Sequence, residues 1–135
     1  MIEYVENACV IDDDPISVFG LRKTFRETNF CKEITVYQNG FEAIHGLKEL
    51  LEAKKSLPPV IFLDLNMPIM DGWDFLEDFI KIPEYNRQNV RIYIISSSVD
   101  PRDLLKAKSY TTVNNFFVKP ITTNDLEKVI HEISQ

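Results

Sequence analysis

Four carboxylates, three hydroxyls and one lysine directly follow short apolar segments of this 135-residue chain, where they could do chemistry together. These residues are Asp12, Asp13 and Asp14 after Ala8–Ile11, Asp64 after Val60–Leu63, Ser96, Ser97 and Ser98 after Ile92–Ile95, and Lys119 after Phe116–Val118. Crowded carboxylates repel one another, so at least one pKa rises unless a cation joins them. Mg²⁺ suits such a cluster because it uses one or two carboxylates and keeps several waters.

A magnesium ion held in this way leaves coordination positions for the oxygens of a phosphoryl group. Lys119 and the hydroxyl of Ser96 would supply a positive charge and a hydrogen-bond donor for the remaining oxygens. Phosphoryl transfer needs little more than a nucleophile in line, a metal and positive groups around the transferred oxygens. A carboxylate can be that nucleophile, with an aspartyl phosphate as the product.

The apolar segments have the pattern of strands in a parallel sheet. Four of them are nearly all apolar, which is typical of strands buried on both faces, whereas Ile34–Tyr37 is more polar and is typical of an edge strand. Apolar residues recur at helical spacing between them, and Thr122 with Asp125 forms a capping pattern before the last helical stretch. We therefore predict alternating strands and helices that end in a fifth helix.

This alternation predicts an α/β fold with five parallel strands, helices on both faces and right-handed crossovers. The expected strand order is 2-1-3-4-5, and ligands of such sheets bind at the carboxyl ends of the strands, where the order reverses. Asp12–Asp14 would lie beside Asp64, Ser96 would flank Asp64 on its other side, and Lys119 would lie one strand further out. The topology thus predicts one site.

The motifs at these strand ends resemble the receiver domain of two-component response regulators. The matching residues are Asp12-Asp13, Asp64-Leu65-Asn66-Met67-Pro68, Asp71-Gly72, Ser96 and Lys119-Pro120. Each motif alone is common, but all of them in order, each at a strand end, form a specific pattern. The resemblance implies a flavodoxin-like, doubly wound (βα)5 three-layer sandwich. We expect one stand-alone receiver domain over residues 1–135, with its core at about 7–134 and no output domain, as in chemotaxis regulators.

The resemblance also implies a role for each matching residue. Asp64 would be the phosphoacceptor, assisted by Lys119 and Ser96. Asp13 would bind Mg²⁺ (or Mn²⁺) directly and Asp12 through water, and Asp64 itself and the main-chain carbonyl of Asn66 would complete the protein ligands. The Lys119–Pro120 peptide bond is usually cis in this family.

Ser96 and Phe116 occupy the switch positions of the family. Ser96 would move towards the phosphoryl group, and Phe116, which lacks the hydroxyl of the common tyrosine, would rotate inward. The change would reach the surface formed by the fourth helix (about Pro101–Tyr110), the fifth strand and the fifth helix. Expected partners are a sensor histidine kinase or histidine phosphotransfer protein, a downstream protein target, and a second copy of the chain in a phosphorylation-dependent homodimer.

The composition of the chain argues against several classes of partner and of protein. The formal charge of −6 argues against nucleic acid or an anionic membrane as a main partner. The two cysteines make neither a disulfide framework nor a zinc site, and Cys9 fits a small buried hydrophobe. We find no signal peptide or membrane-length apolar stretch, so a cytoplasmic protein is expected.

Other functions known for such folds fit less well. A flavodoxin-like FMN carrier needs a hydroxyl- and glycine-rich loop where this chain has Asp12–Asp14. A haloacid-dehalogenase-type phosphatase needs a second aspartate where this chain has Asn66. A docking module of the pseudo-receiver type would lack one of the site residues, and all are present. We expect a signalling protein and not an enzyme, and a phosphorelay intermediate that passes its phosphoryl group to a histidine phosphotransfer protein stays open as an alternative.

Overall fold

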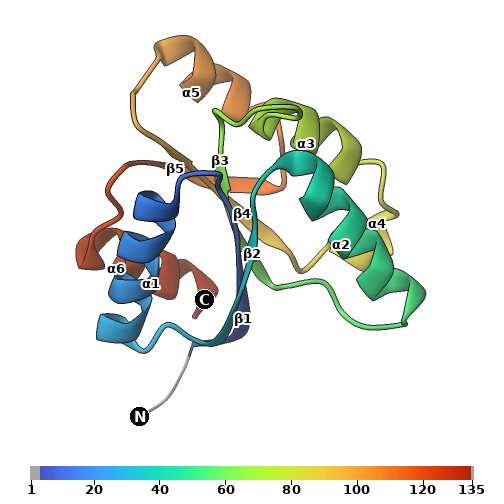
Figure 1. Ribbon diagram of the computed structural model, residues 1–135, viewed down its shortest axis with the longest axis horizontal. Helices are drawn as coiled ribbons and strands as arrows, with labels where there is room; N and C mark the ends of the chain where they lie inside the picture. Colours follow the sequence, from blue (N-terminus) through green and yellow to red (C-terminus); the bar gives the residue numbers. More distant parts are fainter. Residues whose placement is uncertain (1–3, 135) are drawn as a thin grey trace.

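The computed structural model describes residues 4–134 of the protein and contains a parallel five-stranded sheet in the order β2-β1-β3-β4-β5 (Figure 1). The strands are β1 (Val5–Ile11), β2 (Cys31–Tyr37), β3 (Val60–Asp64), β4 (Arg91–Ser96) and β5 (Val113–Val118). The helices are α1 (Pro15–Thr28), α2 (Gly40–Glu52), α3 (Gly72–Phe79), α4 (Glu84–Arg87), α5 (Pro101–Ala107) and α6 (Thr123–Ile133). The predicted α/β fold, its parallel sheet and its strand order are confirmed.

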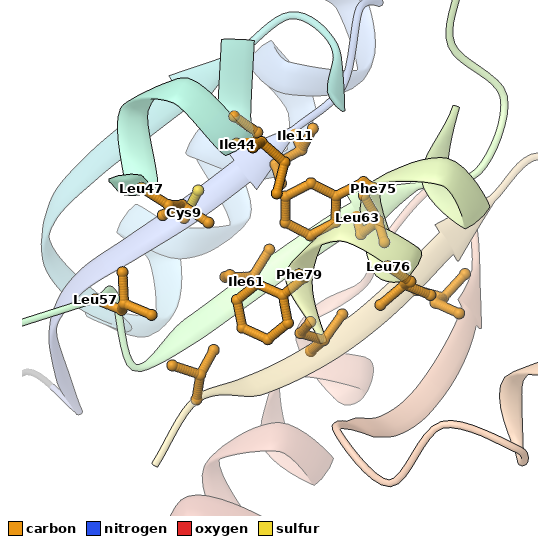
Figure 2. Close-up of a cluster of buried hydrophobic side chains, with 14 of the residues drawn as sticks. Cys9, Ile11, Ile44, Leu47, Leu57, Ile61, Leu63, Phe75, Leu76 and Phe79 are labelled. Carbon is orange, nitrogen blue, oxygen red and sulfur yellow. The ribbon is translucent and has the colours of Figure 1, made fainter. Parts of the chain in front are cut away.

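Two hydrophobic clusters hold the three layers together. Cys9 and Ile11 of β1 face the side covered by α2 and α3 (Figure 2), while Ala8 and Val10 face the side covered by α1 and α6. This alternation follows from the period of two along a strand. Cys9 is fully buried, as predicted, and burial raises the pKa of its thiol. Because both faces of the central strands are covered, their carboxyl ends are fixed in position.

Helices α1 and α6 both begin with side-chain caps, and the cap of α6 is the one predicted from the sequence. Asp14 caps α1 by accepting a hydrogen bond from the main-chain N–H of Ile16, and Pro15 is the first helical residue. Thr122 and Asp125 form a reciprocal capping box at the start of α6. Asp14 is therefore engaged in holding the helix that follows the acidic pair.

The segment 82–89 contains a short helix that the sequence analysis did not predict, so the described chain has six helices and not five. This helix, α4, is a single turn without a buried residue, and therefore gives no apolar periodicity. Pro83 precedes it, and the Nε–H of Arg87 donates to the carbonyl of Ile82 over 2.8 Å. The helix predicted at 101–110 is α5, which ends at Ala107, and the last predicted helix is α6.

Candidate phosphoryl-acceptor site

Three carboxylates meet at the carboxyl ends of β1 and β3, as the strand order predicts. Asp12 and Asp13 follow β1, and Asp64 is the last residue of β3, which pairs with β1 through Ile11 and Leu63. One carboxylate oxygen from each aspartate lies within 4.8 Å of the others. Asp12 and Asp64 are buried, whereas Asp13 is exposed. The cluster is thus open to solvent on the Asp13 side.

Lys119 reaches the carboxylates from the end of β5. Its Nζ lies 2.9 Å from Oδ2 of Asp12 and 3.5 Å from Oδ2 of Asp64, and its side chain is only 17% exposed. The main-chain N–H of Lys119 donates to the carbonyl of Ser96 over 2.8 Å, and the Lys119–Pro120 bond is cis, as expected. Burial would lower the pKa of Lys119, but the two carboxylates outweigh burial and raise it. The ammonium group therefore stays charged.

Asp12 is held in place by more partners than the sequence indicated. Its Oδ1 accepts from the main-chain N–H of Asp14 over 2.9 Å, and its Oδ2 accepts from the hydroxyl of Ser17 over 2.7 Å. Ser17 was not predictable as a site residue, because a single serine in the first turn of a helix carries no distinctive signal. With Lys119 also on Oδ2, both oxygens of Asp12 are engaged.

The surroundings of Asp64 disfavour the charged form of its carboxyl group. Burial and then the charge of Asp12 raise its pKa to about 6, although Lys119 and the N–H of Asn66, 3.3 Å from Oδ1, act in the opposite direction. A carboxyl whose pKa is raised on folding is stabilising when protonated, so its contribution to stability is lost as pH rises through about 6. At neutral pH, without a cation, the charge of Asp64 therefore opposes folding.

Removing one charge from this cluster should stabilise the protein in the absence of a divalent cation. Asp13→Asn is expected to raise the melting temperature in EDTA by about 1–3 °C, because the remaining carboxylates lose an unfavourable neighbour. Differential scanning calorimetry would measure it. Glu33→Gln, which neutralises an exposed carboxylate on β2, is the matched control and should leave the melting temperature nearly unchanged. A melting temperature that is unchanged or lower in Asp13→Asn would contradict the mutual repulsion.

The backbone after β3 passes very close to Asp64. The N–H of Gly72 donates to the carbonyl of Leu65 over 3.0 Å, and a Cβ placed on Gly72 would lie 2.7 Å from the carbonyl oxygen of Asp64. Only glycine fits this approach without a shift of the main chain. The Asp71-Gly72 motif therefore lets α3 begin directly against the strand that carries Asp64.

Ser96 and Phe116 lie on the same face of the sheet as α5. Ser96 ends β4, where its buried hydroxyl accepts a weak hydrogen bond of 3.4 Å from the N–H of Ser98. In the ladder between β4 and β5, Phe116 pairs with Ile94, two residues before Ser96. Phe116 is half-buried and borders a hollow of about 200 Å³ beside α5. The two residues are thus diagonal neighbours.

One histidine and two aromatic residues illustrate side chains that are engaged elsewhere in the fold. His45 lies against the ring of Phe41, with ring centroids 4.3 Å apart. Phe75 is fully buried in the core, whereas Trp73 is half-buried. Within residues 4–134 no helix is both long and apolar enough to cross a membrane.

Comparison with known proteins connects this geometry to a family. The family model of the response regulator receiver domain matches residues 8–131. A two-component response regulator from Cytophaga hutchinsonii has a solved structure that superposes with a TM-score of 0.89, at 32% identity, over 96% of this chain and 97% of that chain.

Two curated relatives also match over most of their length. Sporulation initiation phosphotransferase F of Bacillus subtilis is 28% identical over 125 residues, which cover 93% of this chain and 90% of the relative. A probable methanogenesis regulatory protein of Methanothrix harundinacea is 27% identical over 126 residues, which cover 93% of this chain and 79% of the relative.

Proposed function

The chain belongs to the response regulator receiver family, and on this premise we propose that Asp64 accepts a phosphoryl group from a histidine kinase or a histidine phosphotransfer protein. Receiver domains are signalling proteins that accept phosphoryl groups in two-component systems. The observation that carries the assignment to Asp64 is its position: it is buried at the end of β3, 3.5 Å from Lys119 and beside Asp12 and Asp13. An oxygen of Asp64 would form the bond to phosphorus as the bond from phosphorus to the donor imidazole nitrogen breaks, and the electron pair of that bond stays on the nitrogen.

The donor set fits a hard divalent cation, Mg²⁺ or Mn²⁺. The three carboxylates offer oxygen ligands within 4.8 Å of one another, and the exposed side at Asp13 leaves room for water ligands. Asp13 and Asp64 would bind the ion directly and the carbonyl of Asn66 would add a third ligand. Asp12, whose oxygens are already engaged, would act through water. When bound, the cation neutralises charge on the transferred phosphoryl oxygens.

Lys119 and Asp12 would act as a pair during transfer. The lysine ammonium lies between Asp12 and Asp64, so a phosphoryl group on Asp64 would have a cation within reach. The carboxylates of Asp12 and Asp64 keep this ammonium charged, and the hydroxyl of Ser17 in turn orients Asp12 by donating a hydrogen bond to it. The chain thus supplies positioning and charge, which is most of what phosphoryl transfer requires.

Phosphorylation of the purified protein by a small phosphodonor tests this proposal. With acetyl phosphate and Mg²⁺, the protein should gain one hydroxylamine-labile phosphoryl group per chain, measured by intact-mass spectrometry. The same reaction in EDTA should give none. Labelling that is resistant to hydroxylamine, or that persists in EDTA, would contradict an aspartyl phosphate formed with a divalent cation.

We further propose that the signal leaves the site through Ser96 and Phe116. Ser96 would turn its hydroxyl towards the phosphoryl group, and the ring of Phe116 would move inward on the same face of the sheet. The surface formed by α5, β5 and α6 would then change shape and bind a downstream protein or a second copy of the chain. A ligand shifts such an equilibrium only by its differential affinity for the two states, and a hydrogen bond from Ser96 to the phosphoryl group would supply that difference.

Removing the Ser96 hydroxyl should uncouple the output surface from the site. Ser96→Ala is expected to accept the phosphoryl group about tenfold more slowly, because one donor to the phosphoryl oxygens is lost. It should show little of the chemical-shift change that beryllofluoride causes at Phe116 and α5 in the wild-type protein, as measured by two-dimensional NMR. Ser98→Ala, an exposed neighbour, is the control. A full chemical-shift change in Ser96→Ala would show that another route carries the signal.

The similarity to the Bacillus subtilis relative favours a second role, that of a phosphorelay intermediate. The Bacillus subtilis relative is named a phosphotransferase, so this chain could also pass its phosphoryl group on to a histidine phosphotransfer protein. Loss of the phosphoryl group from Asp64 within seconds of mixing with such a protein from the same genome would favour this relay. A phosphoryl group that stays on Asp64 would favour a terminal switch.

A further inference from the structure

Four side chains join α3 to the end of α5 and the turn that follows it, and we call them the clasp: Trp73, Glu77, Lys106 and Tyr110. The rings of Trp73 and Tyr110 stack with centroids 6.0 Å apart and planes 24° from parallel. Nζ of Lys106 lies 4.7 Å from the centroid of the Trp73 ring, and the hydroxyl of Tyr110 donates a hydrogen bond to the carboxylate of Glu77. Tyr110 also packs against the buried cluster on this side of the sheet.

The helix that the clasp holds is weakly anchored by its other contacts. Of the seven residues of α5 only Ala107 is buried, and Leu105 is 73% exposed. Between α5 and β5 lies the hollow of about 200 Å³, lined by Leu104, Ala107 and Phe116 among others. A helix with so little buried apolar surface gains little from the core, so lateral contacts such as the clasp decide its position.

The opposite end of the clasp is attached to a rigid part of the molecule. Trp73 directly follows Gly72, whose backbone is pressed against Asp64 and Leu65. The α3 end of the clasp is therefore fixed to the strand that carries the acceptor. At its other end, α5 is connected to Ser96 only through the loop that ends at its cap, Asp100. Two separate attachments, the clasp and the loop from Ser96, thus set the position of α5.

The protonated hydroxyl of Tyr110 and the positive charge of Lys106 favour the contacts of the clasp near neutral pH. Burial and then the bond to Glu77 raise the pKa of the Tyr110 hydroxyl to about 12, so it remains a donor. Lys106 lies over the π face of an indole, where a cation is attracted by the ring quadrupole. The clasp therefore combines three different contacts between one face of α3 and the end of α5.

We propose that the clasp is a latch that holds α5 and Phe116 in the unphosphorylated arrangement, so that phosphorylation of Asp64 must act against it. This inference rests on the proposed function, because it requires that the α5–β5 surface has a second arrangement. A contact that stabilises the resting state lowers the population of the active state, and its removal raises that population. Loss of the clasp should therefore make the active state easier to reach, even though it removes stabilising contacts.

Hydrogen exchange in the unphosphorylated protein tests the hold on α5 directly. Tyr110→Phe keeps the ring and removes the hydrogen bond to Glu77, while Trp73→Leu removes both ring contacts. Both variants should raise the exchange rate of amides 102–110 by about threefold or more, because the opening of this segment is limited by these contacts. The control is Tyr85→Phe, an exposed tyrosine on α4, which should change nothing. Unchanged exchange in both clasp variants would overturn the inference.

Affinity for beryllofluoride, a phosphoryl mimic, separates a latch from a merely structural contact. Tyr110→Phe should bind it about threefold more tightly than the wild-type protein in the presence of Mg²⁺, because a larger fraction is already in the competent state. A structural contact would lower the melting temperature and leave this affinity unchanged or weaker, and that result would overturn the latch while the proposed function stands. If the wild-type protein showed no response to beryllofluoride, the proposed function would fail and the latch with it.

Discussion

Asp64→Asn should reduce phosphoryl incorporation from acetyl phosphate by at least about a hundredfold, to the background of the reaction without protein. The amide is nearly isosteric with the carboxylate but is a far weaker nucleophile, so the substitution removes the acceptor and keeps the shape of the site. Asp78→Asn, at a surface position of α3, is the matched control and should retain full incorporation. Intact-mass spectrometry after a fixed reaction time measures both.

The structure also indicates why this loss would not come from unfolding. Asp64 is buried with a pKa raised to about 6, so its charge opposes folding at neutral pH when no cation is bound. Asp64→Asn should therefore melt at a temperature equal to or above that of the wild-type protein in EDTA. Substantial incorporation in a folded Asp64→Asn variant would mean that another side chain accepts the phosphoryl group.

Asp13→Ala should weaken Mg²⁺ binding by more than about tenfold and slow phosphorylation with it. Asp13 is the exposed member of the cluster, whereas the oxygens of Asp12 are occupied by Lys119, Ser17 and the N–H of Asp14. The ligand lost is thus the one most available to a cation. Isothermal titration calorimetry with Mg²⁺ measures the binding, and the acetyl phosphate reaction measures the rate.

Asp12 and Asp14 provide graded comparisons for this result. Asp12→Ala should weaken Mg²⁺ binding less than Asp13→Ala, since Asp12 would act through water. Asp14→Ala should leave Mg²⁺ affinity nearly intact and lower the stability of the fold by about 1 kcal/mol, because Asp14 caps α1. A larger loss of Mg²⁺ affinity in Asp14→Ala than in Asp13→Ala would show that the acidic pair has been assigned to the wrong residues.

The position of the carboxylates was predictable because it follows from topology. In a parallel sheet of this order, residues at the carboxyl ends of β1 and β3 must lie at one edge and side by side. Asp12, Asp13 and Asp64 therefore meet, even though more than fifty positions separate the pair from Asp64. The same argument brings Lys119 within reach of the site from the end of β5. Their chemical roles stay predictions until the variants are measured.

Features that depend on side-chain geometry were not predictable in this way. The bond from Ser17 to Asp12 requires the first turn of α1 to fold back over the strand end, and a serine at that position has many other uses. The helix α4 buries no residue, so no periodicity marked it. The stack between Trp73 and Tyr110 joins residues far apart in the chain, and neither residue type indicates its partner.

The most direct test of the account is to identify the phosphorylated residue in the wild-type protein. After reaction with acetyl phosphate and Mg²⁺, borohydride reduces an acyl phosphate to an alcohol, and peptide mass spectrometry locates the altered side chain. We predict a single altered residue, Asp64, which disappears when the reaction is run in EDTA. Alteration at Asp12, at Asp13 or at any other residue in place of Asp64 would contradict the assignment of the acceptor.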